Sequence, residues 1–240
     1  MPEIPFCPED VRQLFGVLQP QTVVVGGQAL AFWVTAYGIP VTETAISMDA
    51  DVLGKRDDVG IIAAGMHGLP KYQLRSAISA LVGNIRVGRG NDDFISIDVV
   101  DDILGMKAEE VRKRSIAVAF GAVTARIMHP LDVLESRAAN YAGIPEKQTP
   151  EGLTQLRLAI DVATRFLEAV RKEETLIDAA KIIARIHEVY SSKAAIRHAG
   201  IDLLLPLASL QTRSFSTEAG KNFAAIRLPQ LMAKSHATLP

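Results

Sequence analysis

The sequence predicts an α/β fold in which a mixed sheet flanked by helices is followed by a C-terminal helical region. Short apolar segments bounded by turn residues fill the first half of the chain, which is typical of strands. Apolar residues at helical spacing lie between several of these segments. After residue 128 the helical spacing continues without strand-like segments. We therefore expect an α/β domain over residues 1–128 and a helical domain over residues 129–240.

The composition is that of a globular protein in a reducing compartment. Hydrophobic residues make up 48% of the 240 residues and charged residues 22%, which is typical of neither disordered nor fibrous chains. The 26 basic and 27 acidic residues nearly balance, so no net positive field attracts nucleic acid. The single cysteine, Cys7, excludes an internal disulfide. Without a secretory signal pattern or an apolar stretch of about 18 residues, we expect a cytoplasmic protein with no membrane partner.

A strand, a glycine pair and a helix open the expected α/β domain. Helical spacing of apolar residues predicts a first helix over 8–18. The apolar segment 22–25 then predicts a buried strand, and Gly26 and Gly27 follow it directly as a tight turn. A further helix after these glycines should end near Gly38.

The next segment, 45–53, alternates apolar and polar residues. This alternation predicts a strand with Ser47, Asp49 and Asp51 on one face. Beyond it we expect a helix over 55–68, a hairpin of strands 81–87 and 94–100, and strands 115–119 and 123–127.

In the second half, His129 and Pro130 open a helix and residues 143–148 form a linker. Thr149 is a capping residue for a long helix that begins at Pro150. A second long helix carries His187 on its apolar face, and we interpret this histidine as a satisfied core residue. The five histidines lack the spacing of a zinc helix.

Three aspartates are the candidate catalytic and metal-binding residues. Asp49 and Asp51 are two residues apart on a predicted strand, so their carboxylates share one face, roughly 7 Å apart at the backbone. Asp98 lies within the apolar segment of another predicted strand. Carboxylate oxygens are the ligands that Mg²⁺ prefers, and three can hold two metal ions while one acts as a general base. This pattern favours metal-dependent nucleotidyl transfer.

The candidate nucleotide-binding residues are Gly26, Gly27, Ser47 and Lys147. Glycines let phosphate oxygens approach backbone amides, and a helix that begins there adds its positive end. Ser47 shares a face with the acids and can form a hydrogen bond with a phosphate. Lys147 stands near the expected domain junction, where a nucleotide cleft can form. Other cations that can pair with phosphate oxygens are Lys71, Arg75, Arg86 and Arg89.

The segments VVVGGQALAFW, SMDADVL and DFISIDVV together resemble the nucleotidyltransferase superfamily related to DNA polymerase beta. The motif of that superfamily is a Gly-Gly or Gly-Ser turn, an acid-x-acid strand and a later acid. The segment from IMHPLDVLESRAANYAG through TPEGLTQLRLAIDVATRF resembles the linker and helical region of bacterial nucleotidyltransferase-like proteins, many uncharacterised, that are related to abortive-infection toxins. The interval from Gly27 to Asp49 is longer than in the compact form of the family, which an insertion around 38–44 would explain.

The resemblance implies a mixed-sheet nucleotidyltransferase core that transfers a nucleoside monophosphate from a nucleoside triphosphate (NTP) to an acceptor hydroxyl and releases pyrophosphate. It implies that Asp49, Asp51 and Asp98 bind Mg²⁺, and that Gly26 and Gly27 bind the triphosphate. The acceptor classes are RNA, protein and small molecules, and a toxin of this kind would have an antitoxin partner. The alternative is a non-catalytic relative that keeps the fold to bind nucleotide or a partner protein.

Overall fold

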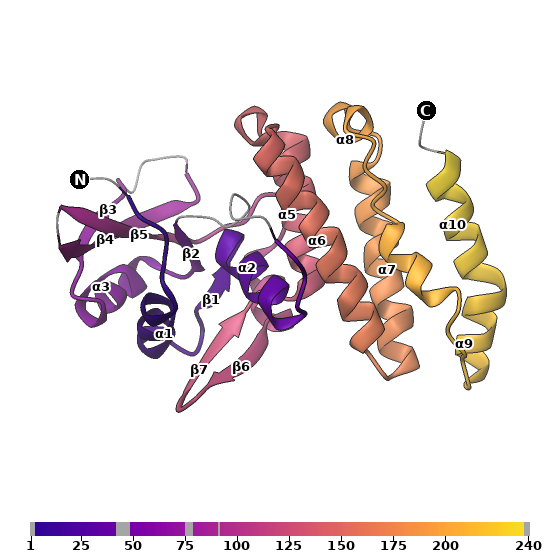
Figure 1. Cartoon of the computed structure of the whole chain (residues 1–240), viewed down its shortest axis with the longest axis horizontal. Helices are drawn as coiled ribbons and strands as arrows, with labels where there is room; N and C mark the ends of the chain where they lie inside the picture. The colour runs from indigo at the N-terminus through magenta and orange to yellow at the C-terminus, as the bar shows by residue number, and fades with distance from the viewer. Residues whose placement is uncertain (1–2, 42–48, 75–78, 91, 238–240) are drawn as a thin grey trace. The chain divides into compact units, whose positions relative to one another are not determined.

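The computed structural model describes residues 3–41, 49–74, 79–90 and 92–237, and the chain forms two compact units (Figure 1). The sheet unit contains Met1–Phe32 and Ile46–His129, and the helical unit contains Trp33–Ala45 and Pro130–Pro240. Helix α2 (Gly26–Ala36) therefore begins in the sheet unit and ends in the helical unit. The division expected from the sequence instead keeps all of residues 1–128 together.

The sheet unit contains a seven-stranded mixed sheet, which confirms the predicted α/β class. The strand order is β3-β4-β5-β2-β1-β7-β6. Strand β2 runs parallel to β5 and β1 runs parallel to β7, whereas the remaining neighbours are antiparallel. The strands are β1 (Val23–Val25), β2 (Ala50–Leu53), β3 (Leu69–Tyr72), β4 (Leu81–Gly90), β5 (Asp93–Val100), β6 (Ile116–Phe120) and β7 (Val123–Ile127).

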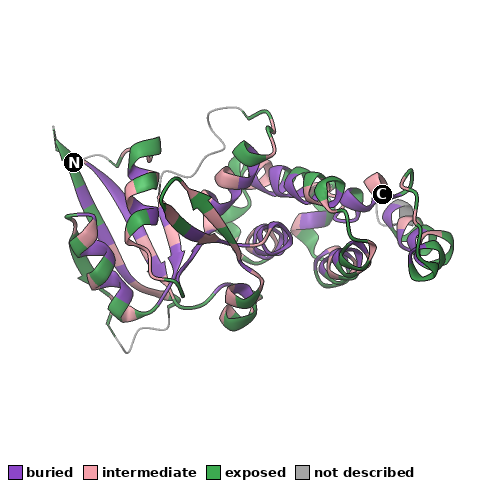
Figure 2. Cartoon of the chain, turned by 90° about the horizontal axis from the view of Figure 1, so that it is seen from below, coloured by how far each residue is buried: buried purple, intermediate pink, exposed green. Residues whose placement is uncertain are grey.

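Among the described residues, the helices of the sheet unit besides the start of α2 are α1 (Pro8–Val17), α3 (Arg56–Gly65) and α4 (Ala108–Arg114). Helices α1 and α3 contact each other, and each also contacts the sheet. The ring of Phe120 on β6 packs edge-on against Phe15 of α1 and Phe32 of α2, with centroid distances of 4.7 and 5.6 Å. This cluster anchors two helices to the end of the sheet at β6. Figure 2 shows buried residues along the strands and exposed residues on the outer helix faces.

The helical unit is organised around α5 (Pro130–Gly143), whose residues from Pro130 to Ala139 are all buried. Helix α5 contacts α6, α7 and α8. The helices and short turns that follow α5 are η2 (Pro145–Lys147), α6 (Pro150–Ala169), α7 (Glu173–Tyr190), α8 (Ala194–His198), η3 (Leu205–Leu210), α9 (Glu218–Asn222), η4 (Phe223–Arg227) and α10 (Leu228–Ala237).

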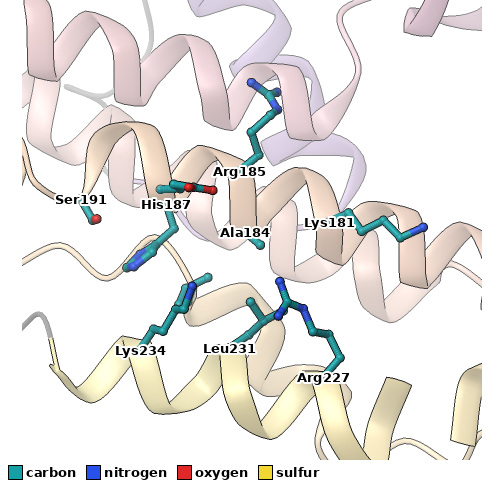
Figure 3. A pocket seen from close by; sticks show the side chains of 10 residues that line it. Lys181, Ala184, Arg185, His187, Ser191, Arg227, Leu231 and Lys234 are labelled. Atoms are coloured by element: carbon teal, nitrogen blue, oxygen red, sulfur yellow. The ribbon is translucent and has the colours of Figure 1, made fainter. Parts of the chain in front are cut away.

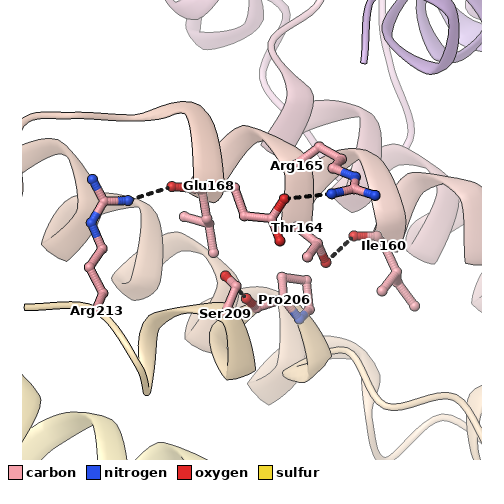
Figure 4. Close-up of polar contacts among 8 residues, drawn as sticks. Ile160, Thr164, Arg165, Glu168, Pro206, Ser209 and Arg213 are labelled. Carbon is pink, nitrogen blue, oxygen red and sulfur yellow. Dashed lines mark hydrogen bonds and ion pairs between the residues drawn. The ribbon is translucent and has the colours of Figure 1, made fainter. Parts of the chain in front are cut away.

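Helix α6 has defined contacts at both ends. The Oγ1 of Thr149 accepts a hydrogen bond from the backbone N–H of Gly152 at 3.1 Å, so this residue caps the helix as the sequence predicts. At the other end, Arg213 donates hydrogen bonds to the carbonyl oxygens of Leu167, at 3.1 Å, and Val170. The last carbonyls of a helix have no partner within the helix, and the guanidinium supplies one here. Figure 4 shows the side chain of Arg213 and, on α6, the ion pair between Arg165 and Glu168.

Some elements differ from the sequence-based expectations. Strand β3 was not predicted, because its four residues are all exposed and include Pro70, as is typical of an edge strand. Strand β2 begins at Ala50, so Asp49 immediately precedes the strand. Ser47 and residues 42–44 of the expected insertion at 38–44 lie outside the described residues.

Candidate metal centre

The parallel pairing of β2 with β5 places two of the candidate aspartates side by side. Asp51 and Asp98 are register partners in this pairing. Asp49 lies one residue before β2. One carboxylate oxygen from each of Asp49, Asp51 and Asp98 lies within 4.8 Å of the other two. All three residues are half-buried, so the three acids converge at a position that solvent ligands can reach.

The first turn of α2 lies against these acids. Gly26 is the first residue of α2, directly after β1, and has a φ of +62°. A Cβ at this position would lie 1.8 Å from Oδ2 of Asp51. The side chain of Gln28 donates a hydrogen bond to the backbone oxygen of Asp49 at 3.5 Å. Gly27 is buried as the second residue of the helix, so both glycines belong to a helix start instead of a separate turn.

Asn84 on β4 is a residue of this site that the sequence did not reveal. It is the register partner of Asp98 in the β4–β5 hairpin. Its Nδ2 donates hydrogen bonds to Oδ1 of Asp98 and to Oγ of Ser96, both at 2.6 Å. These bonds fix the orientation of the Asp98 carboxylate. The register of the hairpin is irregular near both ends of β4. Counting residues from the turn therefore does not predict that Asn84 pairs with Asp98.

The field at the acids is negative. Burial raises the pKa of Asp98, and the charge of Asp49 raises it further, while the hydrogen bond from Asn84 opposes the rise. Burial and the charges of Asp49 and Asp98 also raise the pKa of Glu3, which the charge of Arg86 opposes. Glu3 is held near the acids by a bridge between its own backbone and that of Phe94.

This donor set fits a hard divalent cation. Carboxylate oxygens from three residues are available at close range, and their mutual repulsion would be relieved by a positive ion. Asp49, Asp51 and Asp98 can therefore hold a metal ion.

A cavity of about 340 Å³ adjoins Asp98. Its lining includes Glu3, Asn84 and two exposed cations, Lys71 of β3 and Arg86 of β4. The guanidinium of Arg86 lies over the ring of Phe94, 4.9 Å from the ring centroid and within the range of about 6 Å for a cation–π contact. Two of the cations that the sequence suggested for phosphate binding thus lie beside the acids.

The other predicted binding residues are placed elsewhere. Arg89 forms an ion pair with Asp10 of α1 at 2.5 Å. Lys147 is exposed in η2 and belongs to the helical unit, whereas the acids belong to the sheet unit. Ser47 and Arg75 lie outside the described residues.

Comparisons with known proteins give no family assignment. No protein-family model matches the chain, and no curated protein sequence matches it. Within the part of the chain that the structure describes, no helix combines the length and the apolar character needed to cross a membrane.

Proposed function

We propose that the protein is a magnesium-dependent nucleotidyltransferase that moves a nucleoside monophosphate from an NTP to an acceptor hydroxyl and releases pyrophosphate. The observation that carries this proposal is the convergence of Asp49, Asp51 and Asp98 within 4.8 Å, beside the glycine start of α2. The reaction needs hard oxygen ligands for a metal next to backbone groups that accommodate phosphate. The three segments that resemble the nucleotidyltransferase superfamily support the same reaction.

Each residue of the site has a role in this proposal. Asp49, Asp51 and Asp98 would hold Mg²⁺, and bound Mg²⁺ would neutralise phosphate charge and polarise the acceptor hydroxyl. Asp98 is the candidate general base, because its raised pKa brings it closer to the range in which a carboxylate accepts a proton effectively. Asn84 holds the carboxylate of Asp98 in one orientation for that transfer.

Phosphate groups have two sources of binding energy at this site. The start of α2 at Gly26 offers backbone N–H groups and the positive end of the helix. Lys71 and Arg86, which line the cavity beside Asp98, would pair with phosphate oxygens of the triphosphate or of the departing pyrophosphate. Lys71 and Arg86 belong to β3 and β4, which lie beyond β5 from β1 in the strand order. An anionic substrate would therefore meet positive charge on the β3–β4 side of the acids.

A transfer assay with labelled NTPs tests the proposal. The full chain is incubated with Mg²⁺, each NTP and panels of RNA, protein and small-molecule acceptors, and products are identified by mass spectrometry. Loss of a metal ligand removes several kcal/mol of transition-state stabilisation, so D49N and D51N should each transfer about 10³-fold more slowly. The control is D57N, an exposed acid in the first turn of α3.

Three results separate the hypotheses. Slow transfer in D49N and D51N with normal transfer in D57N supports the enzyme. Unchanged transfer in either D49N or D51N refutes the assigned site. Metal-dependent NTP binding without transfer to any acceptor favours the non-catalytic binding protein instead.

A further inference from the structure

A second cavity, of about 300 Å³, lies within the helical unit between α7 and the segment formed by η4 and α10 (Figure 3). Its charged lining comprises four cations, Lys181, Arg185, Arg227 and Lys234, and one carboxylate, Glu188. Ala184 contributes only a methyl group to the wall on α7. The lining therefore has net positive charge around a space larger than a single water molecule. Burial and the charge of Lys234 lower the pKa of His187, and the charge of Asp202 opposes this lowering.

His187 contributes a buried polar nitrogen to this cavity. The residue is only 7% exposed, and its Nδ1 has no hydrogen-bond partner among the described residues. Buried polar atoms in folded proteins are almost always paired, so an unpaired one calls for a partner that enters the cavity. The interpretation of His187 as a satisfied core residue is therefore wrong. Figure 3 shows its ring directed from α7 toward α10, on the side of Lys234.

The four cations are not equivalent. Arg185 points away from the cavity in Figure 3, and its guanidinium donates to both carboxylate oxygens of Glu135, at 2.7 and 2.5 Å. Lys181 forms an ion pair with Asp178 at 2.9 Å. Their charges are thus largely balanced by local acids.

Arg227 and Lys234 extend from the opposite wall toward α7 (Figure 3). The side-chain hydrogen bond of Arg227 is a long one, 3.4 Å, to Gln230. Such a bond is weak, so the guanidinium retains most of its capacity to donate to a ligand. Positive charge from one wall and the Nδ1 of His187 from the other therefore converge on the same space.

We propose that this cavity binds a small anion that carries a phosphate group, held by Arg227, Lys234 and the Nδ1–H of His187. A guanidinium matches two phosphate oxygens, an ammonium adds a point charge, and a neutral imidazole supplies a single donor. The volume suits inorganic phosphate or a small phosphate monoester. The excess of positive charge excludes cationic ligands and disfavours purely apolar ones. This binding site is independent of the acids in the sheet unit.

NMR of the His187 ring tests the proposal on the full chain. Inorganic phosphate is titrated at constant ionic strength, with chloride as the balancing anion. We expect a saturable change in the ring resonances and an increase in the pKa of His187, because a bound anion stabilises the imidazolium form. The same titration with chloride alone should give no saturable change. A response to chloride equal to that to phosphate, or no response to either, overturns the proposal.

Variants locate the ligand. R227Q and K234Q should each bind phosphate about tenfold more weakly, since each loses a charge-assisted hydrogen bond. H187F keeps the ring volume but removes Nδ1, and it should also weaken binding when followed by calorimetry. K181Q is the matched control, because Lys181 lines the same cavity but is paired with Asp178, and its affinity should stay close to that of the wild type.

Two further comparisons make the result decisive. Thermal unfolding shows whether each variant is folded, and both Arg227 and Lys234 are exposed, so their replacement should leave the fold intact. D51N should leave the phosphate response of His187 unchanged, which separates this cavity from any phosphate that binds at the aspartates. Wild-type affinity in both R227Q and K234Q would refute the assignment whatever the outcome of the transfer assay.

Discussion

Gly26 and Asp51 lie so close together that no side chain fits at Gly26: a Cβ there would lie 1.8 Å from Oδ2 of Asp51. The antiparallel pairing of β1 with β2 causes this approach, because Val25 is the register partner of Asp51. Gly26 also has a φ of +62°, a value that L-amino acids rarely adopt and that glycine, which has no side chain, adopts readily. The carboxylate of Asp51 therefore occupies the space that any larger residue at the helix start would need.

We predict that G26A lowers the free energy of unfolding and abolishes nucleotidyl transfer. The positive φ alone costs an alanine about 1–2 kcal/mol. Displacement of the Asp51 side chain adds about 1–3 kcal/mol, typical of an overpacked position, and moves one of the acids. Chemical denaturation and the transfer assay measure the two effects.

The matched control is G121A, in the turn between β6 and β7. Gly121 also has a φ of +62°, but a Cβ there meets nothing within 4 Å. This variant should show only the conformational cost and keep full transfer activity. Equal destabilisation of G26A and G121A would mean that displacement of the Asp51 side chain costs no free energy, contrary to the prediction.

The raised pKa of Asp98 predicts a stability that depends on pH and metal. A carboxyl with a folded-state pKa above its ordinary value of 3.8 keeps its proton in the folded state at pH values where the unfolded chain has lost it. The folded state then binds more protons, so the free energy of unfolding falls as the pH rises from 3.8 through the folded-state pKa. Without divalent metal, D98N should therefore be more stable than the wild type above this range.

Magnesium should reverse that order. A ligand that binds only the folded state adds about 2.7 kcal/mol at a concentration 100-fold above its Kd. The wild type should gain stability with Mg²⁺ in this way, whereas D98N, which lacks one ligand, should gain much less. Denaturation with chelator and with Mg²⁺ measures the difference, and D57N should behave like the wild type. The same gain in D98N as in the wild type would show that Asp98 is not a metal ligand.

The local pattern of the sequence predicts much of the sheet unit. The alternation in residues 94–100 and the turn-rich segment before it are sufficient to predict the β4–β5 hairpin, because strand period and turn chemistry are local properties. The same reasoning predicts β1, the start of α2 and the capping by Thr149. It also identifies the three acids as candidates before their positions are known.

Non-local features could not be predicted in this way. The parallel register that pairs Asp51 with Asp98 joins segments separated by the β3–β4 region, and no local pattern fixes it. The same holds for Asn84, whose role depends on a bulged register. The helical pattern correctly assigns His187 to a buried face, but it contains no information on whether Nδ1 has a partner.

The ion pair between Glu135 and Arg185 should stabilise the helical unit. The side chain of Glu135 is 3% exposed and that of Arg185 is 48% exposed. R185A would leave a buried carboxylate without its cation, which costs about 3–5 kcal/mol for a fully buried pair. Because the arginine is half-exposed, we expect the lower part of that range or somewhat less, about 2–3 kcal/mol, by chemical denaturation.

The control on the same helix is K181A. Lys181 and Asp178 form an exposed pair with exposed fractions of 71% and 69%, so its loss should change stability by less than about 1 kcal/mol. The double variant E135M/R185M should recover most of the stability lost in R185A, because neither charge is then buried alone. Equal free energies of unfolding for R185A and K181A would show that water solvates the Glu135 carboxylate in place of Arg185.

Glu173 joins the start of α7 to the start of α9. Its carboxylate accepts hydrogen bonds from the backbone N–H of Ser216, at 2.5 Å, and of Thr217, at 2.9 Å, and from both hydroxyls. These bonds to the ionised form, the backbone N–H of Ser216 first among them, lower the pKa of Glu173 to about 2. The carboxylate thus fixes α9 in place only while it is charged.

We predict that acid releases this contact and that E173Q removes its pH dependence. With a folded-state pKa of about 2 and an ordinary value of 4.5, the stabilisation is complete above pH 4.5 and is lost as the pH falls toward 2. Hydrogen exchange of the Gly220 amide, which donates to Thr217 within the same cap, should accelerate over that range in the wild type.

In E173Q the exchange of the Gly220 amide should be fast already at neutral pH, since an amide group offers only one acceptor oxygen for the four donors. E174Q, one residue further along α7, should behave like the wild type. Slow exchange at neutral pH in E173Q would show that the hydroxyls and the Thr217 cap hold α9 without the charge.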